Sequence, residues 1–445
     1  MIRRVLIANR GEIAARIIGT CRRLGIETVL ATSAADVHSV PARMADGVLC
    51  IGPAPSPQSY LNAAAIVAAA NAAKCDAIHP GYGFLSESIV LAAEARKAGL
   101  IFIGPTEAQL AGVGDKLRAR ELAVAAEIPV VPGGAVRSTE EAREIVTKLG
   151  CPILVKAVGG GGGRGMKLML DPAKADETIA MAMAEAEAAF GDARVYLERF
   201  IAHGRHIEVQ LLGDGKTVIH LGDRDCSIQR RYQKMVEEAQ SPDLDDALRA
   251  RLHGAAVAYG CALAYRGLGT VEFLVDTERG EFYFLEMNAR IQVEHPVTEA
   301  VTGLDLVAEQ IAVAEGRTLR LAQDGVDFSG HAIEFRINAE DSARDFCPSP
   351  GTVTKAVFPA GEGIRVDTHV EAGSTIPPFY DSLVAKIIVH GIDRPAALAL
   401  ARRALEGCHI EGVATNLDMH RALLADAEFV RGGVDTAYFN RFWRS

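Results

Sequence analysis

The stretch KAVGGGGGRGMKLML, residues 156–170, sets five consecutive glycines between two short apolar runs. Each glycine in ordered structure costs about 0.5–1 kcal/mol relative to alanine, so the five cost about 2.5–5 kcal/mol. Since about 5–15 kcal/mol holds a typical domain folded, such a run needs a use. The flanking runs predict two β-strands. The glycines then form a hairpin tip whose bare amides can close on phosphate oxygens.

Two well-known phosphate-binding loops do not fit this run. Gly160, Gly162 and Gly165 have the spacing of the dinucleotide fingerprint, but a strand follows where that motif needs a helix N-terminus. A Walker loop is excluded because no Gly-Lys-Ser or Gly-Lys-Thr follows. An exposed flexible loop is the simple alternative. Against it, Lys156 stands inside the apolar strand before the glycines, where a lysine normally has a partner.

Composition and charge indicate a multidomain globular protein. At 445 residues the chain is too long for one ordinary core, and 49% hydrophobic with 23% charged residues is typical of a globular protein. The net charge of −10 argues against nucleic acid as a partner. The eight cysteines form no CxxC pair, which favours reduced thiols, and no apolar run approaches the length of a membrane span. We therefore expect a cytoplasmic protein with no membrane segment.

A β-turn-α-β alternation opens the chain. Apolar strands are predicted at 5–8, 27–32, 75–80 and 100–105, with a helix after the first strand that stops at Gly25. This alternation indicates a parallel sheet with crossover helices. The turn ANRGE after the first strand has a single glycine, so we expect no dinucleotide there.

The rest of the chain predicts mostly antiparallel strands. A charged helix from Lys116 to about Pro129 leads into a smaller domain, in which the glycine hairpin precedes a helix around 173–190 and a strand at 194–201. Period-two alternation then indicates antiparallel strands at 206–215, 217–231, 270–276 and 281–288. The tail mixes strands with a final helical stretch. We predict four domains, at residues 1–113, 114–200, 201–330 and 331–445.

A cluster of polar residues follows the predicted hairpin. Glu272 and Glu286 fall on its two strands, and with Asn288 they offer the hard oxygen ligands that Mg²⁺ with a nucleotide requires. In the next segment, Arg290, Gln292 and Glu294 alternate, so they project to one side if the backbone is extended. An arginine, an amide and a carboxylate beside a metal suit a small oxyanion that must be held and deprotonated.

Five segments carry most of the remaining information: KAVGGGGGRGMK (156–167), RDCSIQRRYQKMVEEAQSP (224–242), EMNARIQVEHPVTE (286–299), GYGFLSE (81–87) and EFRINAED (334–341). They resemble the signature sequences of biotin carboxylases, which belong to the ATP-grasp superfamily. The resemblance covers essentially the whole chain. It implies a Rossmann-like N-terminal domain, an ATP-grasp unit with a mobile glycine-rich lid, and a mixed α+β C-terminal domain. The implied activity is ATP-dependent carboxylation of biotin with bicarbonate through carboxyphosphate, the first half-reaction of a carboxylase such as acetyl-CoA carboxylase.

The same resemblance implies a role for each matching residue. ATP is expected to contact Lys116, Lys156, Gly162, Gly163, Glu198, Arg199, Phe200, Ile201, His206, Gln229 and Tyr232, together with Glu272 and Glu286. Two Mg²⁺ ions, or Mn²⁺, are expected on Glu272, Glu286 and Asn288. Bicarbonate is expected against Lys234, Arg290, Gln292, the Val293 amide and Glu294, with Glu294 as the base. Biotin is expected against Arg336, Tyr82 and Gly83, with Arg336 stabilising the enolate-like oxygen.

The resemblance also implies partners and shows departures from the family. Biotin on a carboxyl carrier protein is the expected acceptor, and carboxyltransferase subunits are the expected consumers of the product. Most family members have histidine where this chain has Tyr232, which leaves the affinity for ATP open. Gly19 and Arg23 replace a charge pair common in homodimeric members, so a homodimer and a monomer both remain open.

Two rival functions and three simpler residue interpretations are kept. The chain could be another ATP-grasp ligase that makes an acylphosphate from a different carboxylate, or a non-catalytic nucleotide-binding subunit. Cys226 is expected to be structural rather than an activated thiol, because one side of its strand is apolar. His79 and His295, each beside a proline, are expected in turns or hydrogen bonds rather than as metal ligands, because no ligand spacing supports them.

Overall fold

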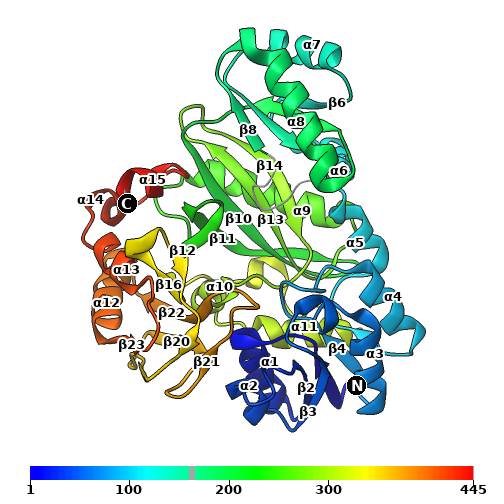
Figure 1. Cartoon of the computed structure of the whole chain (residues 1–445), viewed down its shortest axis with the longest axis vertical. Helices are drawn as coiled ribbons and strands as arrows, with labels where there is room; N and C mark the ends of the chain where they lie inside the picture. Colours follow the sequence, from blue (N-terminus) through cyan, green and yellow to red (C-terminus); the bar gives the residue numbers. More distant parts are fainter. Residues whose placement is uncertain (160–165, 444–445) are drawn as a thin grey trace.

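The structure, a computed structural model, describes residues 1–159 and 166–443. A parallel sheet near the N-terminus, a small four-stranded sheet at the opposite end and a long antiparallel sheet make up its main body (Figure 1). The predicted α/β class is confirmed. Gly162 and Gly163, predicted at the tip of the glycine-rich lid, lie outside the described residues.

The N-terminal sheet has the strand order β3-β2-β1-β4-β5. All its pairings are parallel, as the alternation predicts; the strands are β1 (Arg4–Ile7), β2 (Glu27–Ser33), β3 (Gly47–Gly52), β4 (Ala77–His79) and β5 (Ile101–Phe102). Its helices include α1 (Gly11–Leu24), α3 (Ala63–Ala72) and α4 (Ile89–Lys97). Helix α1 ends as predicted at Gly25, which has a φ of 67° and donates to the Arg22 carbonyl. Sequence analysis missed β3, an edge strand in which no residue is fully buried.

The four-stranded sheet carries the glycine-rich hairpin. Its order is β6-β9-β7-β8, formed by β6 (Gly133–Val136), β7 (Ile153–Ala157), β8 (Met166–Met169) and β9 (Val195–Arg199). Lys156 on β7 pairs with Met166 on β8, so the two flanks of the glycine run are antiparallel neighbours, as predicted. Helices α7 (Thr139–Leu149) and α8 (Ala175–Phe190) pack on this sheet around a separate small core.

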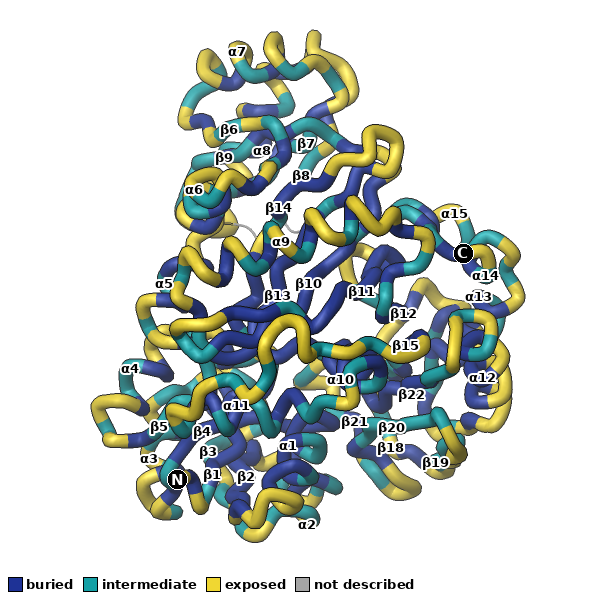
Figure 2. Tube along the Cα trace, turned by 180° about the vertical axis from the view of Figure 1, so that it is seen from behind, coloured by how far each residue is buried: buried dark blue, intermediate teal, exposed yellow. Residues whose placement is uncertain are grey.

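The long sheet runs through the middle of the molecule and across residue 331. Its order is β14-β13-β10-β11-β12-β15-β22-β20, and all pairings are antiparallel. The strands are β10 (Gly204–Asp214), β11 (Val218–Arg230), β12 (Gln233–Ala239), β13 (Arg266–Asp276), β14 (Glu281–Asn288), β15 (His331–Asn338), β20 (Ile364–Thr368) and β22 (Leu383–Gly391). Figure 2 shows its central strands buried along most of their length.

Helices cover this sheet along its length. Helix α9 (Asp246–Ala262) packs on β10 and β11, α11 (Leu306–Ala314) on β13, and α12 (Arg394–Gly407) on β15 and β22. Helix α10 (His295–Thr302) lies against β11, β12, β15 and β22. None of the described helices combines the length and the apolar character needed to cross a membrane.

Shorter elements complete the described chain. Two helices lead from the first sheet to the small one, α5 (Glu107–Gly114) and α6 (Lys116–Ala125). The remaining short helices and strands are α2 (Val40–Met44), β16 (Glu340–Asp341), β17 (Cys347–Pro348), β18 (Gly351–Thr352), β19 (Lys355–Val357), β21 (Thr375–Ile376), β23 (His409–Glu411), α13 (Leu417–Leu423), α14 (Ala427–Arg431) and α15 (Tyr438–Phe442).

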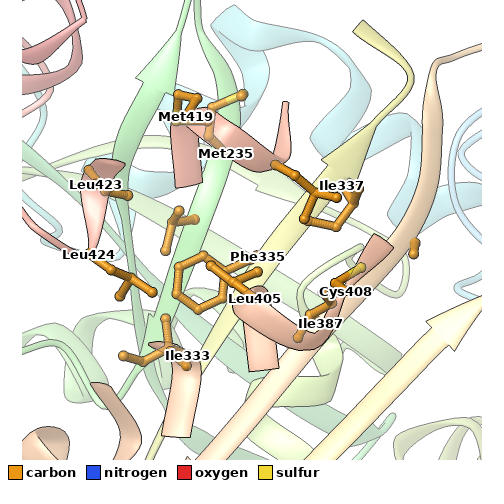
Figure 3. Close-up of a cluster of buried hydrophobic side chains, with 14 of the residues drawn as sticks. Met235, Ile333, Phe335, Ile337, Ile387, Leu405, Cys408, Met419, Leu423 and Leu424 are labelled. Atoms are coloured by element: carbon orange, nitrogen blue, oxygen red, sulfur yellow. The ribbon is translucent and has the colours of Figure 1, made fainter. Parts of the chain in front are cut away.

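The C-terminal part of the long sheet has its own hydrophobic core. Phe335 of β15 is fully buried and lies among Leu405, Leu423 and Leu424 from the covering helices (Figure 3). Its ring meets the ring of His420 edge-on at 5.5 Å. The neighbouring residue in the chain, Arg336, points to the other face of the sheet, because successive side chains of a strand alternate. The apolar face of β15 therefore anchors the strand that presents Arg336.

Replacing Phe335 by alanine tests this anchoring. We expect the free energy of unfolding to fall by about 3–5 kcal/mol, because the substitution removes a fully buried ring and leaves a cavity. Chemical denaturation followed by tryptophan fluorescence or circular dichroism measures it. Phe379→Ala is the matched control: this ring is 50% exposed, so its loss should change stability by about 0.5 kcal/mol or less. Equal losses from the two variants would contradict the assignment of the core.

Candidate active site

One cavity of about 790 Å³ collects nearly all the residues that the sequence singles out. It lies among the small sheet, the long sheet, the loop after β4 and the strands of the C-terminal part. Its volume is within the usual range for a small-molecule site. Among its lining residues are Tyr82, Gly83, Lys116, Lys156, Glu198, Arg199, Phe200, Ile201, His206, Gln229, Tyr232, Lys234, Glu272, Glu286, Asn288, Arg290, Gln292, Val293 and Arg336. Glu294 is fully buried directly behind this lining.

Lys234 of β12 joins three carboxylates at the base of the cavity. Its Nζ lies 2.5 Å from Glu208 Oε2, 3.0 Å from Glu272 Oε1 and 2.7 Å from Glu294 Oε1. Burial opposes the charge of this amine, but the acidic groups around it raise its pKa well above the usual range for lysine. Lys234 is therefore a permanent cation that stabilises the buried carboxylates around it.

Glu294 lies between two cations. In addition to the bond from Lys234, its Oε2 accepts a hydrogen bond of 2.9 Å from Arg336 Nη2. Burial alone would raise the pKa of this carboxyl, but Lys234 and Arg336 hold it well below its usual range. Arg336 is itself fixed by Glu237, whose Oε1 accepts from Arg336 Nε at 2.5 Å. The site therefore holds an ionised carboxylate at neutral pH, next to a guanidinium that also lines the cavity.

The segment that carries Arg290, Gln292 and Glu294 differs from the extended backbone considered from sequence. It is irregular after Asn288, and helix α10 begins at His295 with Glu294 as its N-cap residue. The three side chains still converge, because the chain folds back toward β12 and β15. The spacing in the sequence predicted that these three side chains converge, but that prediction assumed an extended backbone, which the structure does not have.

Arg290 organises the polar wall next to Glu272. It donates hydrogen bonds of 2.9 Å to Glu87 Oε2, 2.9 Å to Gln292 Oε1 and 2.8 Å to Asn288 Oδ1. Glu87 belongs to the GYGFLSE segment of the N-terminal part and received no role from sequence. Its partner is 203 positions away in the chain, so only the fold reveals the pair.

The two carboxylates predicted to bind a cation lie opposite each other on β13 and β14. Glu272 and Glu286 are direct cross-strand partners. Burial, followed by the charge of Glu272, raises the pKa of Glu286 although Lys116 acts in the opposite direction. Glu286 lines the cavity and is exposed. Two like charges in this position are destabilising unless a cation joins them, so the donor set fits a divalent ion.

A second arrangement of possible ligands lies deeper. Single ligand atoms of His206, Glu208 and Glu272 all lie within 4.8 Å of one another. His206 Nε2 is 2.9 Å from Glu272 Oε2, and Lys234 contacts both glutamates. The ammonium of Lys234 already lies between Glu208 and Glu272. Glu272 and its partner on the other side, Glu286, are therefore the better candidates for binding a metal. Asn288 donates to Glu272 Oε1 at 2.8 Å and so belongs to the same wall.

The opposite wall of the cavity comes from the small sheet. Lys156 of β7 forms an ion pair with Glu198 of β9, and both side chains line the cavity.

Polar side chains of the long sheet also line the cavity. On β10 and β11, His206 Nδ1 lies 2.7 Å from Gln229 Nε2. Tyr232 stands at the rim, 60% exposed, in a two-residue turn between β11 and β12 in which its φ is 66°. An exposed aromatic ring in a strained turn is free to stack on a ligand.

Sequence analysis missed four charged residues that hold the site together. Besides Glu87 these are Glu208, Arg224 and Glu237, all 0% exposed. Arg224 Nε donates to Glu208 Oε1 at 2.6 Å, which orients Glu208 toward Lys234. One signal was available for Glu208, which lies between Ile207 and Val209 in a strand, where a charged residue is rarely buried without a partner. The pattern indicated a partner without saying which one.

The three simpler residue interpretations agree with the structure. Burial raises the pKa of the Cys226 thiol well above its usual range, so this thiol stays protonated. Burial lowers the pKa of His79 to about 3, and its Nδ1 accepts from the Gly81 amide at 3.1 Å. His295 is fully buried, with Nδ1 2.8 Å from the Gln292 carbonyl oxygen.

Comparisons with known proteins agree along the whole chain. Residues 1–110 match the model of the biotin carboxylase N-terminal domain, residues 115–322 that of the carbamoyl-phosphate synthase L chain ATP-binding domain, and residues 334–441 that of the biotin carboxylase C-terminal domain. A biotin carboxylase of Pseudomonas aeruginosa is 47% identical over 99% of this chain and 98% of its own length.

Solved structures show the same relationship. A biotin carboxylase from Campylobacter jejuni, in a β-γ-ATP complex, has a TM-score of 0.95 with 43% identity, covering 99% of each chain. The biotin carboxylase domain dimer of the 2-oxoglutarate carboxylase of Hydrogenobacter thermophilus, with MgADP, ADP and bicarbonate, has a TM-score of 0.94 with 42% identity, covering 100% of this chain and 99% of its own.

Replacing Glu286 by glutamine tests the opposed carboxylates. Because the pKa of Glu286 is raised in the folded protein, its ionised form destabilises the fold above the ordinary pKa of 4.5, and this penalty disappears as the pH falls below that value. In metal-chelated buffer we expect Glu286→Gln to stabilise the protein at pH 7 by about 0.2–1 kcal/mol and to have little effect near pH 4. Thermal unfolding at both pH values measures it. Glu278→Gln, in the exposed turn between the same strands, is the control and should change neither value; a loss of stability at pH 7 in Glu286→Gln would contradict the repulsion.

Proposed function

Since the chain belongs to the biotin carboxylase family of ATP-grasp ligases, we propose a role for each residue of its cavity and the reaction in which its product is used. The enzyme carboxylates biotin with ATP and bicarbonate. One observation carries the assignment of roles: a buried, ionised Glu294 lies between Lys234 and Arg336. A carboxylate held this way can take a proton on one side, while the guanidinium stabilises a negative oxygen on the other.

Bicarbonate is held by Lys234, Arg290, Gln292 and the backbone N–H of Val293. Arg290 is already oriented by Glu87, and its planar fork suits an oxyanion. The carbonyl of Val293 accepts from Lys386 Nζ at 2.8 Å, which fixes the orientation of the loop on either side of that residue. Two of the four donors, Arg290 and Val293, are thus prearranged by contacts outside the cavity, and less ordering of the protein remains when the anion binds.

Glu294 removes the bicarbonate proton. In the structure its pKa is low, which by itself makes it a weak base. When Lys234 turns from Glu294 to the bound bicarbonate, the attraction that lowers the pKa weakens, so Glu294 becomes more basic when its substrate is present. A bicarbonate oxygen then bonds to the γ-phosphorus of ATP as the bond from phosphorus to ADP breaks, which yields carboxyphosphate.

Arg336 acts in the second step. Carboxyphosphate splits into CO₂ and phosphate, and the phosphate takes the proton of the biotin ureido nitrogen, which bonds to CO₂. The negative charge that develops on the ureido oxygen is stabilised by the guanidinium of Arg336, with Tyr82 and Gly83 beside the ring. Glu237 holds this guanidinium in position throughout.

Nucleotide and metal occupy the other end of the cavity. ATP contacts Lys116, Lys156, His206, Gln229 and Tyr232, and the segment 198–201 takes the adenine. Glu272, Glu286 and Asn288 hold the Mg²⁺ ions of the nucleotide, and the same oxygen donors also suit Mn²⁺. When bound, the metal neutralises charge on the phosphates and so eases attack by an anion.

The wider setting of the reaction is also a proposal. The acceptor is biotin on a carboxyl carrier protein, and a carboxyltransferase passes the carboxyl group on to an acyl-CoA in the cytoplasm. The choice of an acyl-CoA rests on the family resemblance of the sequence segments, since the name of the P. aeruginosa relative gives no final acceptor and another relative is a domain of a 2-oxoglutarate carboxylase. A homodimer is proposed as the working form by analogy with that domain dimer.

Two variants separate the two steps. We expect Glu294→Gln to lose bicarbonate-dependent ATP hydrolysis by about 10²–10⁴-fold, because the base is gone. Arg336→Ala should retain slow bicarbonate-dependent ATP hydrolysis, while carboxylation of free biotin falls by about 10²–10³-fold. Phosphate release with and without bicarbonate, and labelled carboxybiotin, measure the two activities. Full biotin carboxylation by Arg336→Ala would remove Arg336 from the mechanism, and ATP hydrolysis independent of bicarbonate in the unaltered enzyme would favour another ATP-grasp ligase.

The final acceptor is tested in the native assembly. The chain is isolated with its carrier and carboxyltransferase partners and supplied with ATP and labelled bicarbonate. Acetyl-CoA, pyruvate and 2-oxoglutarate are then offered in turn. We expect acid-stable label in the acyl-CoA alone. Label in pyruvate or 2-oxoglutarate would contradict the acyl-CoA proposal while leaving biotin carboxylation intact.

A further inference from the structure

Two short turns contact each other beside the active-site cavity. The first consists of Arg231 and Tyr232 and joins β11 to β12. The second, residues 342–346, joins β16 to β17. Gln233, directly after the first turn, and Glu340, shortly before the second, both line the cavity. Tyr232 lies in the same lining, whereas residues 342–346, all of them described, lie outside it.

Both turns have backbone angles that side chains rarely adopt. The angle φ is 50° at Arg231 and 66° at Tyr232, and it is 51° at Asp345 and 56° at Phe346. Glycine adopts this left-handed region readily and aspartate tolerates it, but it is uncommon for an aromatic residue. Such a conformation persists only where the surrounding contacts hold it. The contacts between the two turns therefore help to determine where the Tyr232 ring lies.

Asp345 joins the two turns through both of its carboxylate oxygens. Its Oδ1 accepts from Arg230 Nη2 at 2.7 Å, and its Oδ2 accepts from Arg231 Nη2 at 2.8 Å. Arg230 Nη2 also donates to the carbonyl oxygen of Asp345 at 2.6 Å. The hydrogen bond from Arg230 lowers the pKa of the Asp345 carboxyl, so the contact is between two charged groups at neutral pH. Because the two arginines directly precede Tyr232 in the chain, these bonds restrain the backbone that carries the ring.

Arg230 is the stronger of the two anchors. Its side chain is 13% exposed, against 71% for Arg231, and its guanidinium lies 4.3 Å from the centre of the Phe346 ring. An ion pair between exposed groups contributes little, whereas a guanidinium stacked on a ring and bonded to a carbonyl is held in one geometry. Phe346 is buried in the C-terminal core, where its ring centre lies 5.9 Å from that of Phe439. The C-terminal core is thus connected to the end of β11 through Phe346 and Arg230.

We propose that Arg230 and Asp345 are positioning residues for ATP, because their contact holds the turn that presents the Tyr232 ring to the nucleotide. The inference rests on the proposed function, in which Tyr232 contacts ATP. Tyr232 is 60% exposed, so the packing of its own ring does not hold it, and the turn beneath it must do so. A ring that is already in place loses less conformational freedom when the nucleotide binds. Neither Arg230 nor Asp345 lines the cavity, so both act through Tyr232.

The test removes the carboxylate and leaves the backbone undisturbed. Asp345→Gly loses the bonds of the side chain but keeps the carbonyl oxygen, and glycine adopts a φ of 51° readily. We expect the Kd of a non-hydrolysable ATP analogue with Mg²⁺, measured by calorimetry, to rise about threefold, because a smaller fraction of the protein has the ring in place. The kcat of bicarbonate-dependent ATP hydrolysis and the KM for bicarbonate should not change.

Two further variants serve as rescue and control. Asp345→Asn tolerates the same φ and keeps one side-chain acceptor, so it should recover part of the affinity for the nucleotide. Glu411→Gln removes a charge from the exposed ion pair with Lys355, which lies outside the cavity lining, and it should leave the Kd unchanged.

A double-variant cycle shows whether the effect passes through the ring. Tyr232→Asn removes the ring and tolerates the φ of 66°. This variant should weaken nucleotide binding by itself, and the addition of Asp345→Gly should weaken it no further. If Asp345 acted only on the stability of the fold, the loss would be the same with and without the ring.

Unchanged nucleotide affinity in Asp345→Gly, or an equal loss with and without the Tyr232 ring, would overturn the inference. A parallel rise in the KM for bicarbonate would also overturn it, because it indicates a general disturbance of the site. If Asp345→Gly does not fold, Arg230→Lys replaces it; lysine keeps the charge but lacks the planar fork, and the same rise in Kd is expected. The proposed function fails differently: the unaltered enzyme would then show no bicarbonate-dependent ATP hydrolysis, or Tyr232→Asn would bind the nucleotide as well as the unaltered enzyme does.

Discussion

The site depends on a buried ion cluster in which Lys234 and Arg336 hold Glu294. Each charge taken out of water is costly and must be compensated by a partner at close range. The members of the cluster come from different elements: Glu208 from β10, Lys234 from β12 and Glu272 from β13, with Glu294 before α10 and Arg336 on β15. Their pairing therefore requires the register of the long sheet, in which Glu208 faces Glu272 directly. A slip of one residue in any of these strands would move its charge to the opposite face.

In the proposed mechanism, the same cluster explains how a weakly basic carboxylate, Glu294, can serve as a base. Lys234 shares its charge among three carboxylates, so an incoming anion competes for a cation that is already in position. Each contact that Lys234 gives up makes a carboxylate more basic. Binding and proton removal are thus linked through one ammonium group. Arg224, fully buried beneath Glu208, keeps the remaining charges paired during the exchange.

Local patterns in the sequence predicted the helices and strands better than the contacts between residues far apart in the chain. The stop at Gly25, the glycine-rich hairpin and the opposed Glu272 and Glu286 follow from glycine conformation and from period-two alternation, both of which act over a few residues. The contact of Glu87 with Arg290 spans 203 positions, and no local pattern encodes it. Strand β3 was missed because an edge strand with no fully buried residue lacks the strong apolar signal of the inner strands. The roles in the cavity came from family resemblance, since residue type alone does not distinguish a base from an anchoring ion pair.

In the proposed mechanism, the continuity of the long sheet explains how two substrates reach one base. Strands β15, β22 and β20 extend the sheet that carries Glu272 and Glu286, and Arg336, Lys386 and Asp367 form one row of direct cross-strand partners. Residues in such a row share a face of the sheet. The row leads from the guanidinium beside Glu294 to the ammonium of Lys386, which contacts Glu12 of helix α1. Because a paired sheet resists bending within its plane, Arg336 and Lys386 are held in fixed positions relative to each other. The small sheet forms a separate core with helices α7 and α8, so we expect any movement for nucleotide entry to occur there.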